Sequence, residues 1–151
     1  MTSTALEFNV SDLGPSLERL IEAANPDMPE LLENVGAIIE SQTKYRISDE
    51  KTSPSGEPWA DWSEDYAKTR TSAHSLLEGE GFLYDSIAHE VLGDDVQIGS
   101  GMIYAAIQQF GGADVGKPGL ASREYLGLSE ANKSEVLEFV EDYLAGRLED
   151  A

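Results

Sequence analysis

Residues 111–117, GGADVGK, come closest in this chain to a motif that carries chemistry. They satisfy the G-x-x-x-x-G-K half of a phosphate-binding loop. Such a loop also needs Ser or Thr after the lysine to bind magnesium, and a helix that begins there so that backbone N–H groups point at phosphate. Pro118 and Gly119 follow instead. The sequence therefore favours a glycine-rich surface loop over a nucleotide site.

The histidines and serines form no recognisable catalytic set. His74 and His89 are the two histidines, and His89 falls in an expected strand with no second imidazole nearby in the sequence, which indicates a structural role. Nucleophilic serines often occupy a G-x-S-x-G turn, whereas Ser100 lies in IGSGM, which does not match. We expect no Ser-His-Asp site.

Two carboxylate pairs could in principle support acid–base chemistry or bind a hard cation, namely Asp94 with Asp95 and Glu78 with Glu80. Neither pair lies in a loop with the spaced oxygen ligands of a calcium site, so both are interpreted as turn or solvated acids. A small hydrolase that uses such a pair is a weak alternative. The chain has no cysteine. We expect no catalytic residue, cofactor or metal, and hence a binding or assembly protein that is not an enzyme.

Charge is the strongest compositional feature. The 151 residues carry a formal net charge of -19, and residues 44–70 are nearly balanced while both flanks are acidic. Proteins that bind duplex DNA neutralise phosphates with Lys and Arg, so most of this surface should repel nucleic acid. No apolar run approaches the roughly 20 residues of a membrane span, and residues 1–10 do not resemble a signal peptide. We expect synthesis in the cytoplasm and no membrane partner.

The apolar spacing predicts an α+β fold in one domain over residues 1–151. Alternation predicts a strand over 5–10, and a helix begins at Pro15 and ends near Asn25. Asp27 caps a second helix that extends to Tyr45. Residues 87–92 and 96–100 form a hairpin, and Ser129 caps a C-terminal amphipathic helix. The small antiparallel sheet is thus packed by an N-terminal helix pair and the C-terminal helix.

The remaining predictions concern segments expected at the protein surface. Residues 48–62 are rich in proline, glycine and polar residues, which predicts that no regular element passes through them, and Ser63 caps a short helix that ends near Arg70. Trp59 and Trp62 either cover the edge of the core or form a partner interface, where Trp is enriched. Phe110 is expected in the core or at an interface. The glycine loop 111–122 is the second candidate contact surface.

The order of several motifs resembles the phage virion morphogenesis family, whose members act as tail-completion or head–tail joining proteins. These motifs are PSGEPW at 54–59, LLEGEGFL at 76–83, IGS at 98–100, YAAIQQFGG at 104–112 and SREYLGLS at 122–129. Gln108 replaces the family's common histidine, and residues 121–124 replace its proline–alanine–arginine–proline.

The resemblance implies a small structural subunit of the neck or tail end of the virion. It implies a ring of identical subunits that contact tail-tube or head-connector proteins, with the genome passing nearby without specific binding. Acidic walls suit such a path, because like charge prevents DNA from adhering. A ring built by head-to-tail contacts needs two complementary patches on each subunit. The candidate interface residues are Trp59, Trp62, Tyr66, Phe110, Lys117 and Arg123.

An acidic DNA mimic that inhibits a nucleic-acid-binding protein is the alternative from another functional class. Its basis is the net charge of -19. Mimicry requires carboxylates in rows at phosphate spacing, whereas the acids here are interleaved with the expected core positions of helices. The sequence therefore favours the structural subunit.

Overall fold

The computed structural model describes residues 4–61, 82–102, 105–112 and 121–149. Its sheet has three antiparallel strands in the order β1-β3-β2, which are β1 (Thr4–Asn9), β2 (Ala88–Leu92) and β3 (Asp95–Ser100). The β2–β3 hairpin is the one expected from the sequence. β1 pairs along the other side of β3, from Thr4 opposite Ser100 to Asn9 opposite Asp95. The first strand is therefore held by a partner far along the chain.

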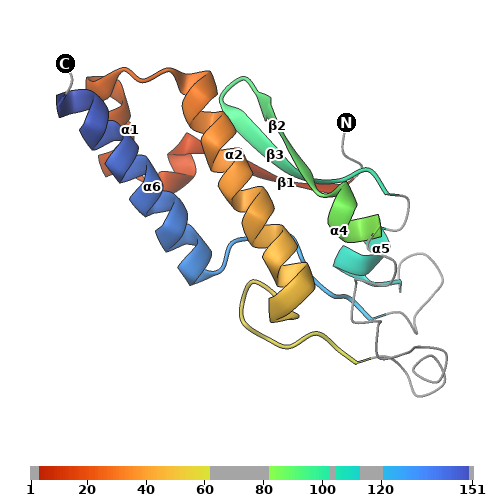
Figure 1. Cartoon of the computed structure of the whole chain (residues 1–151). Helices are drawn as coiled ribbons and strands as arrows, with labels where there is room; N and C mark the ends of the chain where they lie inside the picture. Colours follow the sequence, from red (N-terminus) through yellow and green to blue (C-terminus); the bar gives the residue numbers. More distant parts are fainter. Residues whose placement is uncertain (1–3, 62–81, 103–104, 113–120, 150–151) are drawn as a thin grey trace.

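Helices form the rest of the fold (Figure 1). The expected N-terminal pair is α1 (Pro15–Ala24) and α2 (Met28–Tyr45), and the C-terminal helix is α6 (Glu130–Glu149). Asp27 caps α2, since its Oδ1 accepts a hydrogen bond from the backbone N–H of Glu30 at 3.2 Å. Ser129 caps α6, since its Oγ accepts from the N–H of Asn132 at 3.0 Å. The remaining helices are short: η1 (Val10–Leu13), η2 (Arg46–Glu50), α4 (Phe82–Ser86) and α5 (Ala105–Phe110).

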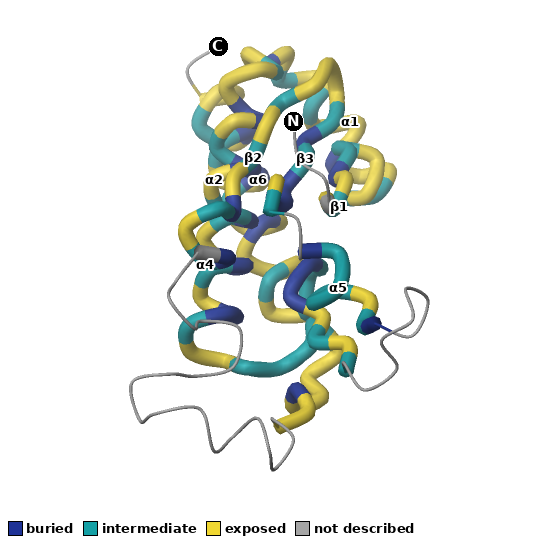
Figure 2. The backbone as a smooth tube through the Cα atoms, turned by 90° about the vertical axis from the view of Figure 1, so that its right-hand side faces the viewer, coloured by how far each residue is buried: buried dark blue, intermediate teal, exposed yellow. Residues whose placement is uncertain are grey.

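The core lies where α2 meets the sheet on one side and α6 on the other. α2 packs against β2 and β3, and α6 packs beside both α1 and α2. Figure 2 shows buried positions along α2, β3 and α6, with exposed positions on the outer sides of the helices. These contacts confirm the predicted α+β class. The fully buried side chains of the core include Leu31, Leu32, Val35, Ile39, Val96, Ile98, Val140 and Leu144.

No helix or strand passes through the described part of residues 48–62, as predicted, but the preceding helix ends later than expected. α2 continues as the π-helical turn η2 to Glu50, and Thr52 forms a β-bridge with Pro58. The helix continues because Arg46 and Ile47 are buried, and it ends at Lys51, whose positive φ of 56° breaks the helical path. The helix expected over 63–70 lies outside the described residues.

The apolar stripes of the helices are wider than the surfaces that they bury. Four apolar residues at helical spacing with the core positions are exposed, because each helix contacts its neighbours along only part of its stripe: Leu20 at 38%, Tyr45 at 56%, Leu137 at 36% and Leu148 at 40%. Helices α4 and α5 were not expected, since pieces this short carry too little periodicity to identify. In the described part of the chain no helix is both long and apolar enough to cross a membrane.

Candidate assembly interface

Residues 121–129, which we name the anchor segment, form an irregular strip held against the short helix α5. The side-chain Oε1 of Gln109 accepts hydrogen bonds from the backbone N–H groups of Tyr125 and Leu126, each at 3.0 Å. The hydroxyl of Tyr125, which is fully buried, donates to the carbonyl of Ala105 at 2.9 Å. Burial raises the pKa of Tyr125 above its ordinary value. These contacts fix α5 on the body of the protein.

The loop 51–61 holds the anchor segment from a second side. The indole N–H of Trp59 donates to the carbonyl of Glu124 at 2.9 Å. Arg123 donates from Nε to the carbonyl of Ala60 at 2.8 Å and from Nη2 to the carbonyl of Asp61 at 3.1 Å. Trp59 is only 6% exposed. In this structure Trp59 therefore covers the edge of the core, and Arg123 supports the loop.

Arg46, at the end of α2, holds the anchor segment from beneath. Its Nη1 donates to the carbonyls of Tyr125 at 2.7 Å and Gly127 at 3.1 Å, and its Nη2 donates to Oδ1 of Asn132. Its guanidinium is 1% exposed and lies 3.8 Å from a carboxylate oxygen of Glu50. Burial lowers the pKa of Arg46, and the charge of Glu50 opposes that shift. One buried cation thus joins the end of α2 to the anchor segment and the start of α6.

Gly127 permits close approach between two motifs that are distant in the sequence. A Cβ atom at this position would lie 2.6 Å from Cγ of Pro54, and the φ angle of Gly127 is +141°. Pro54 begins PSGEPW and Gly127 belongs to SREYLGLS. Two of the five motifs of the sequence resemblance therefore meet in space.

Phe110 lies at the end of α5, and its side chain is exposed to solvent. At 72% it is the most exposed large hydrophobic residue in the described part of the chain, whereas Ala105 at the other end of α5 is fully buried. A large exposed aromatic side chain on a firmly anchored element is typical of a contact surface. Phe110 is accordingly the centre of the candidate interface.

The structure brings Trp59, Arg123 and Phe110 to one region around α5 and the anchor segment. Trp62, Tyr66 and Lys117 lie outside the described residues, as do residues 113–120 of the glycine loop, which include most of its phosphate-loop match. The sequence interpretation missed Arg46. A signal for it was present, because Ile39, Thr43 and Arg46 follow each other at helical spacing on the buried face of α2.

His89 has the structural role that the sequence indicated, in an unexpected setting. Its Nδ1 lies 2.9 Å from Oε1 of Glu40 and its Nε2 lies 2.6 Å from Oε1 of Glu33. The ring packs on Gly36, where a Cβ would lie 2.5 Å from its Cδ2. Burial lowers the pKa of His89, but the hydrogen bonds to Glu40 and Glu33 and the two negative charges outweigh it, so the pKa is raised. A charged imidazolium can donate to both carboxylates, which a neutral ring cannot.

At the hairpin pair of acids, Asp94 and Asp95, the contacts are made with Asn9 at the end of β1. Asp95 accepts a hydrogen bond from Nδ2 of Asn9 at 2.6 Å, and the carbonyl of Asp94 accepts from the same amide at 3.4 Å. Glu78 and Glu80 lie outside the described residues. Among the residues that the structure describes, no group of three or more His, Asp or Glu side chains could hold a metal ion. What the described residues offer at this site is a contact surface.

Comparison with known proteins supports an assembly role. Residues 8–145 match the model of the phage virion morphogenesis family. The chain belongs to this family. It is also 28% identical over 121 residues to the putative capsid assembly protein G of Escherichia phage Mu, a match that covers 76% of this chain and 78% of that protein. No solved structure matches the chain. This virion morphogenesis protein therefore acts in phage assembly, as the order of its motifs implied.

Proposed function

We propose that this protein is a non-enzymatic structural subunit of the neck or tail end of a phage particle. In this proposal copies of the chain form a ring around the DNA path, and the ring joins or completes the tail. The supporting observation is the exposure of Phe110 on α5, a helix anchored by buried hydrogen bonds to the anchor segment. Membership of the family supplies the assembly context.

The anchoring around α5 supports the choice of this surface. A subunit contact is stronger when its groups are already ordered, because immobilising them during association costs free energy. Gln109, Trp59 and Arg46 hold the anchor segment from separate parts of the chain. Phe110 can therefore enter a neighbour's surface without ordering its own support. The candidate contact residues named from the sequence are Trp59, Phe110 and Arg123 in this region, together with Trp62, Tyr66 and Lys117, which lie outside the described residues.

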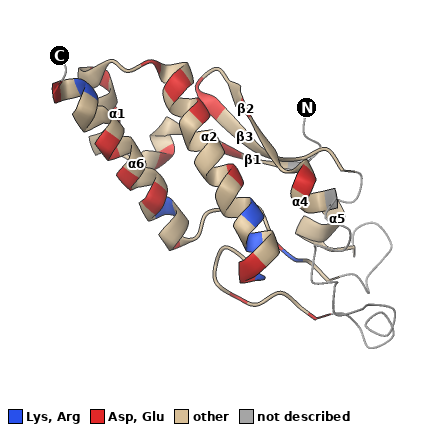
Figure 3. Ribbon diagram, viewed as in Figure 1, with Lys and Arg blue, Asp and Glu red and all other residues tan. Residues whose placement is uncertain are grey.

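The charge distribution fits a ring through which DNA passes. Acidic residues occur along α1, α2 and α6, and the fewer basic residues include a group at the end of α2 (Figure 3). With a net charge of -19, the surface repels phosphate over most of its area. A passing genome would then contact the ring without adhering to it.

The structure gives less support to a DNA mimic. Several carboxylates make contacts within the chain: Glu33 and Glu40 contact His89, Glu135 accepts from Gln42, and Glu30 accepts from Tyr143. A mimic needs its carboxylates free and arranged in rows. The alternative therefore ranks below the structural subunit.

Native mass spectrometry of the purified chain and immuno-electron microscopy of particles from a phage that encodes it would test the proposal together. We expect a closed homo-oligomer in solution or on addition of tail-tube protein, and label at one end of the tail. A chain that stays monomeric with those partners and is absent from purified particles would refute the ring.

A further inference from the structure

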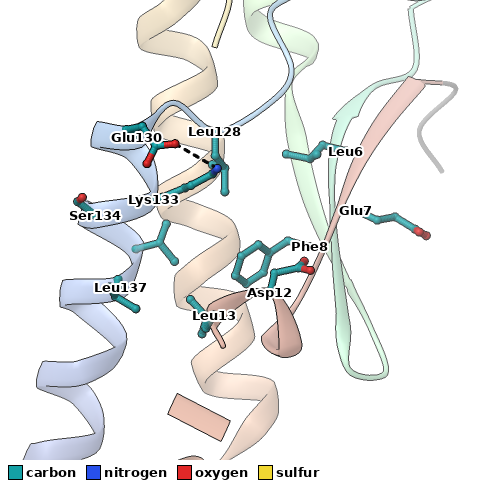
Figure 4. Close-up of a pocket in the computed structure, with 11 residues that line it drawn as sticks. Leu6, Glu7, Phe8, Asp12, Leu13, Leu128, Glu130, Lys133, Ser134 and Leu137 are labelled. Atoms are coloured by element: carbon teal, nitrogen blue, oxygen red, sulfur yellow. Dashed lines mark hydrogen bonds and ion pairs between the residues drawn. The ribbon is translucent and has the colours of Figure 1, made fainter. Parts of the chain in front are cut away.

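A groove separates β1 and η1 from the first half of α6 (Figure 4). Its volume is about 580 Å³. Leu6 and Phe8 of β1 point into it from one side, and Leu137 of α6 faces it from the other. Leu137 is 36% exposed, although it belongs to the apolar stripe of its helix. The groove is thus an apolar surface that the described part of the chain leaves uncovered.

One wall of this groove is the free edge of a strand. β1 is an outer strand in the order β1-β3-β2, and no strand in the described ranges pairs with its other side. It has six residues, TALEFN, without the proline or lysine that commonly protects an edge. At a rise of roughly 3.3 Å per residue, the edge offers about 20 Å of backbone donors and acceptors. Such an edge can accept an added strand.

The rim of the groove is acidic. Glu7, Asp12 and Glu130 line it against a single base, Lys133, which lies 3.5 Å from Glu130. A second copy of the chain would bring another surface from a protein of net charge -19. Like charges placed opposite one another oppose association, whereas Lys and Arg would pair with the rim. Charge complementarity therefore favours a basic occupant from a different protein.

We propose that β1 and this groove bind an extended segment of another protein in which apolar residues alternate with Lys or Arg. The segment adds to the sheet beside β1. Its apolar side chains then lie beside Leu6 and Phe8 and face Leu137, and the alternate basic side chains lie beside Glu7, which points to the other face of the sheet. That the donor is another virion protein rests on the proposed assembly role, but the binding chemistry does not depend on ring formation.

A synthetic peptide would serve as the probe. The peptide is an acetylated octamer that alternates lysine and valine, and the full-length chain is titrated with it while amide resonances are followed by NMR. We expect saturable shifts in Leu6, Phe8 and residues 133–137, and slower amide exchange in β1. A peptide of the same composition in the order Lys-Lys-Val-Val should bind at least tenfold more weakly, because it cannot present one apolar face. Equal binding of the two peptides would overturn the proposal by showing a non-specific charge effect.

A matched pair of leucines on α6 tests the location. Leu137→Arg introduces a cation into the groove, while Leu148→Arg makes the same change at a residue of similar exposure outside it. We expect Leu137→Arg to weaken peptide binding at least tenfold and Leu148→Arg to leave it within twofold. Ser134→Trp, at an exposed position on the groove's rim, should also block binding and leave the core untouched. Equal effects of the two arginine variants, or peptide binding unchanged by Ser134→Trp, would overturn the proposed site.

The oligomeric state separates this proposal from the ring. If the groove binds another protein, Leu137→Arg leaves the mass of the homo-oligomer unchanged. If Leu137→Arg dissociates it, the groove is a contact between copies and the proposal is wrong. Peptide binding by a chain that forms no ring would instead support the groove and refute only the proposed ring.

Discussion

Arg46 is a buried cation that connects three parts of the chain: the end of α2, the anchor segment and the start of α6. It donates to the carbonyls of Tyr125 and Gly127 and to the side chain of Asn132. Asn132 also accepts from the N–H of Ser129 at the start of α6. A planar guanidinium can reach several acceptors at once, which an ammonium group cannot do in the same geometry. The end of α2 thereby orders both the anchor segment and the cap of α6.

Replacement of Arg46 should therefore destabilise the whole fold. We expect Arg46→Met to lower the free energy of unfolding by about 3 kcal/mol, because buried carbonyls lose their donors, and Arg46→Lys to lower it by about half as much. Urea denaturation followed by circular dichroism would measure both. Lys133→Met, which removes an exposed cation, should change stability by less than about 0.5 kcal/mol. Wild-type stability in Arg46→Met would show that packing alone holds this region.

His89 should make the contact between β2 and α2 sensitive to pH. Its pKa is raised in the folded protein, so protonation stabilises the fold. That contribution is complete below the ordinary histidine pKa of about 6.5 and is lost as pH rises through the raised value. We expect the difference in unfolding free energy between the wild type and His89→Gln to shrink from pH 6 to pH 9.

NMR titration of the His89 ring would test the cause directly. Its midpoint should lie above that of an ordinary histidine and should fall in Glu33→Gln, which removes one of the two carboxylates. Lys44 lies 3.7 Å from Glu40, the second of these carboxylates. A midpoint unaffected by Glu33→Gln would contradict this account.

Elements were predictable where their signals are local. Asp27 before α2, Ser129 before α6, and Gly93 with Asp94 between β2 and β3 mark boundaries that depend on neighbouring residues alone. The η2 extension was not predicted because it depends on the burial of Arg46 against carbonyls of the anchor segment. The carbonyl of Tyr125 is 79 residues further along the chain. The exposure of Phe110 was likewise undecided, since periodicity does not show which faces remain uncovered.

The contact between loop 51–61 and the anchor segment requires glycine at position 127. We expect Gly127→Ala to cost about 1–3 kcal/mol, because its positive φ disfavours a side chain and the new Cβ would clash with Pro54. Gly146→Ala on α6 is a matched control. Nothing lies within 4 Å of a Cβ there, and alanine should stabilise the helix by about 0.5–1 kcal/mol.

Thermal denaturation of these variants and of Gly127→Ala combined with Pro54→Ala would separate the two causes. Removal of the proline ring should recover the part of the loss that comes from the clash. If the combined variant were as unstable as the sum of the single changes, the close approach of Pro54 would contribute nothing.

At the scale of the whole molecule, assembly should depend on Phe110 more than folding does. We expect Phe110→Ser to reduce homo-oligomer formation at least tenfold while changing unfolding free energy by less than about 0.5 kcal/mol, the usual range for surface substitutions. The side chain is 72% exposed, so its loss creates no cavity. Native mass spectrometry and thermal melts would provide the two readouts.

Leu92→Ser, at an exposed position of the β2–β3 hairpin, is the control for a general loss of surface apolarity. It should assemble like the wild type. If Phe110→Ser also assembled like the wild type, the α5 surface would not be the contact.

The pairing of β1 with β3 also constrains how the chain matures during synthesis. Asn9 of β1 pairs with Asp95 of β3, which is 86 positions later in the chain, so this pairing cannot form until Asp95 has been synthesised. At roughly 5–20 residues per second on the ribosome, that delay is on the order of ten seconds. Throughout this interval β1 is outside the exit tunnel without its partner strand β3, while α1 and α2 can already form helices. The β2–β3 hairpin is therefore the template on which the first strand docks, and newly made copies are most vulnerable to premature aggregation before translation reaches it.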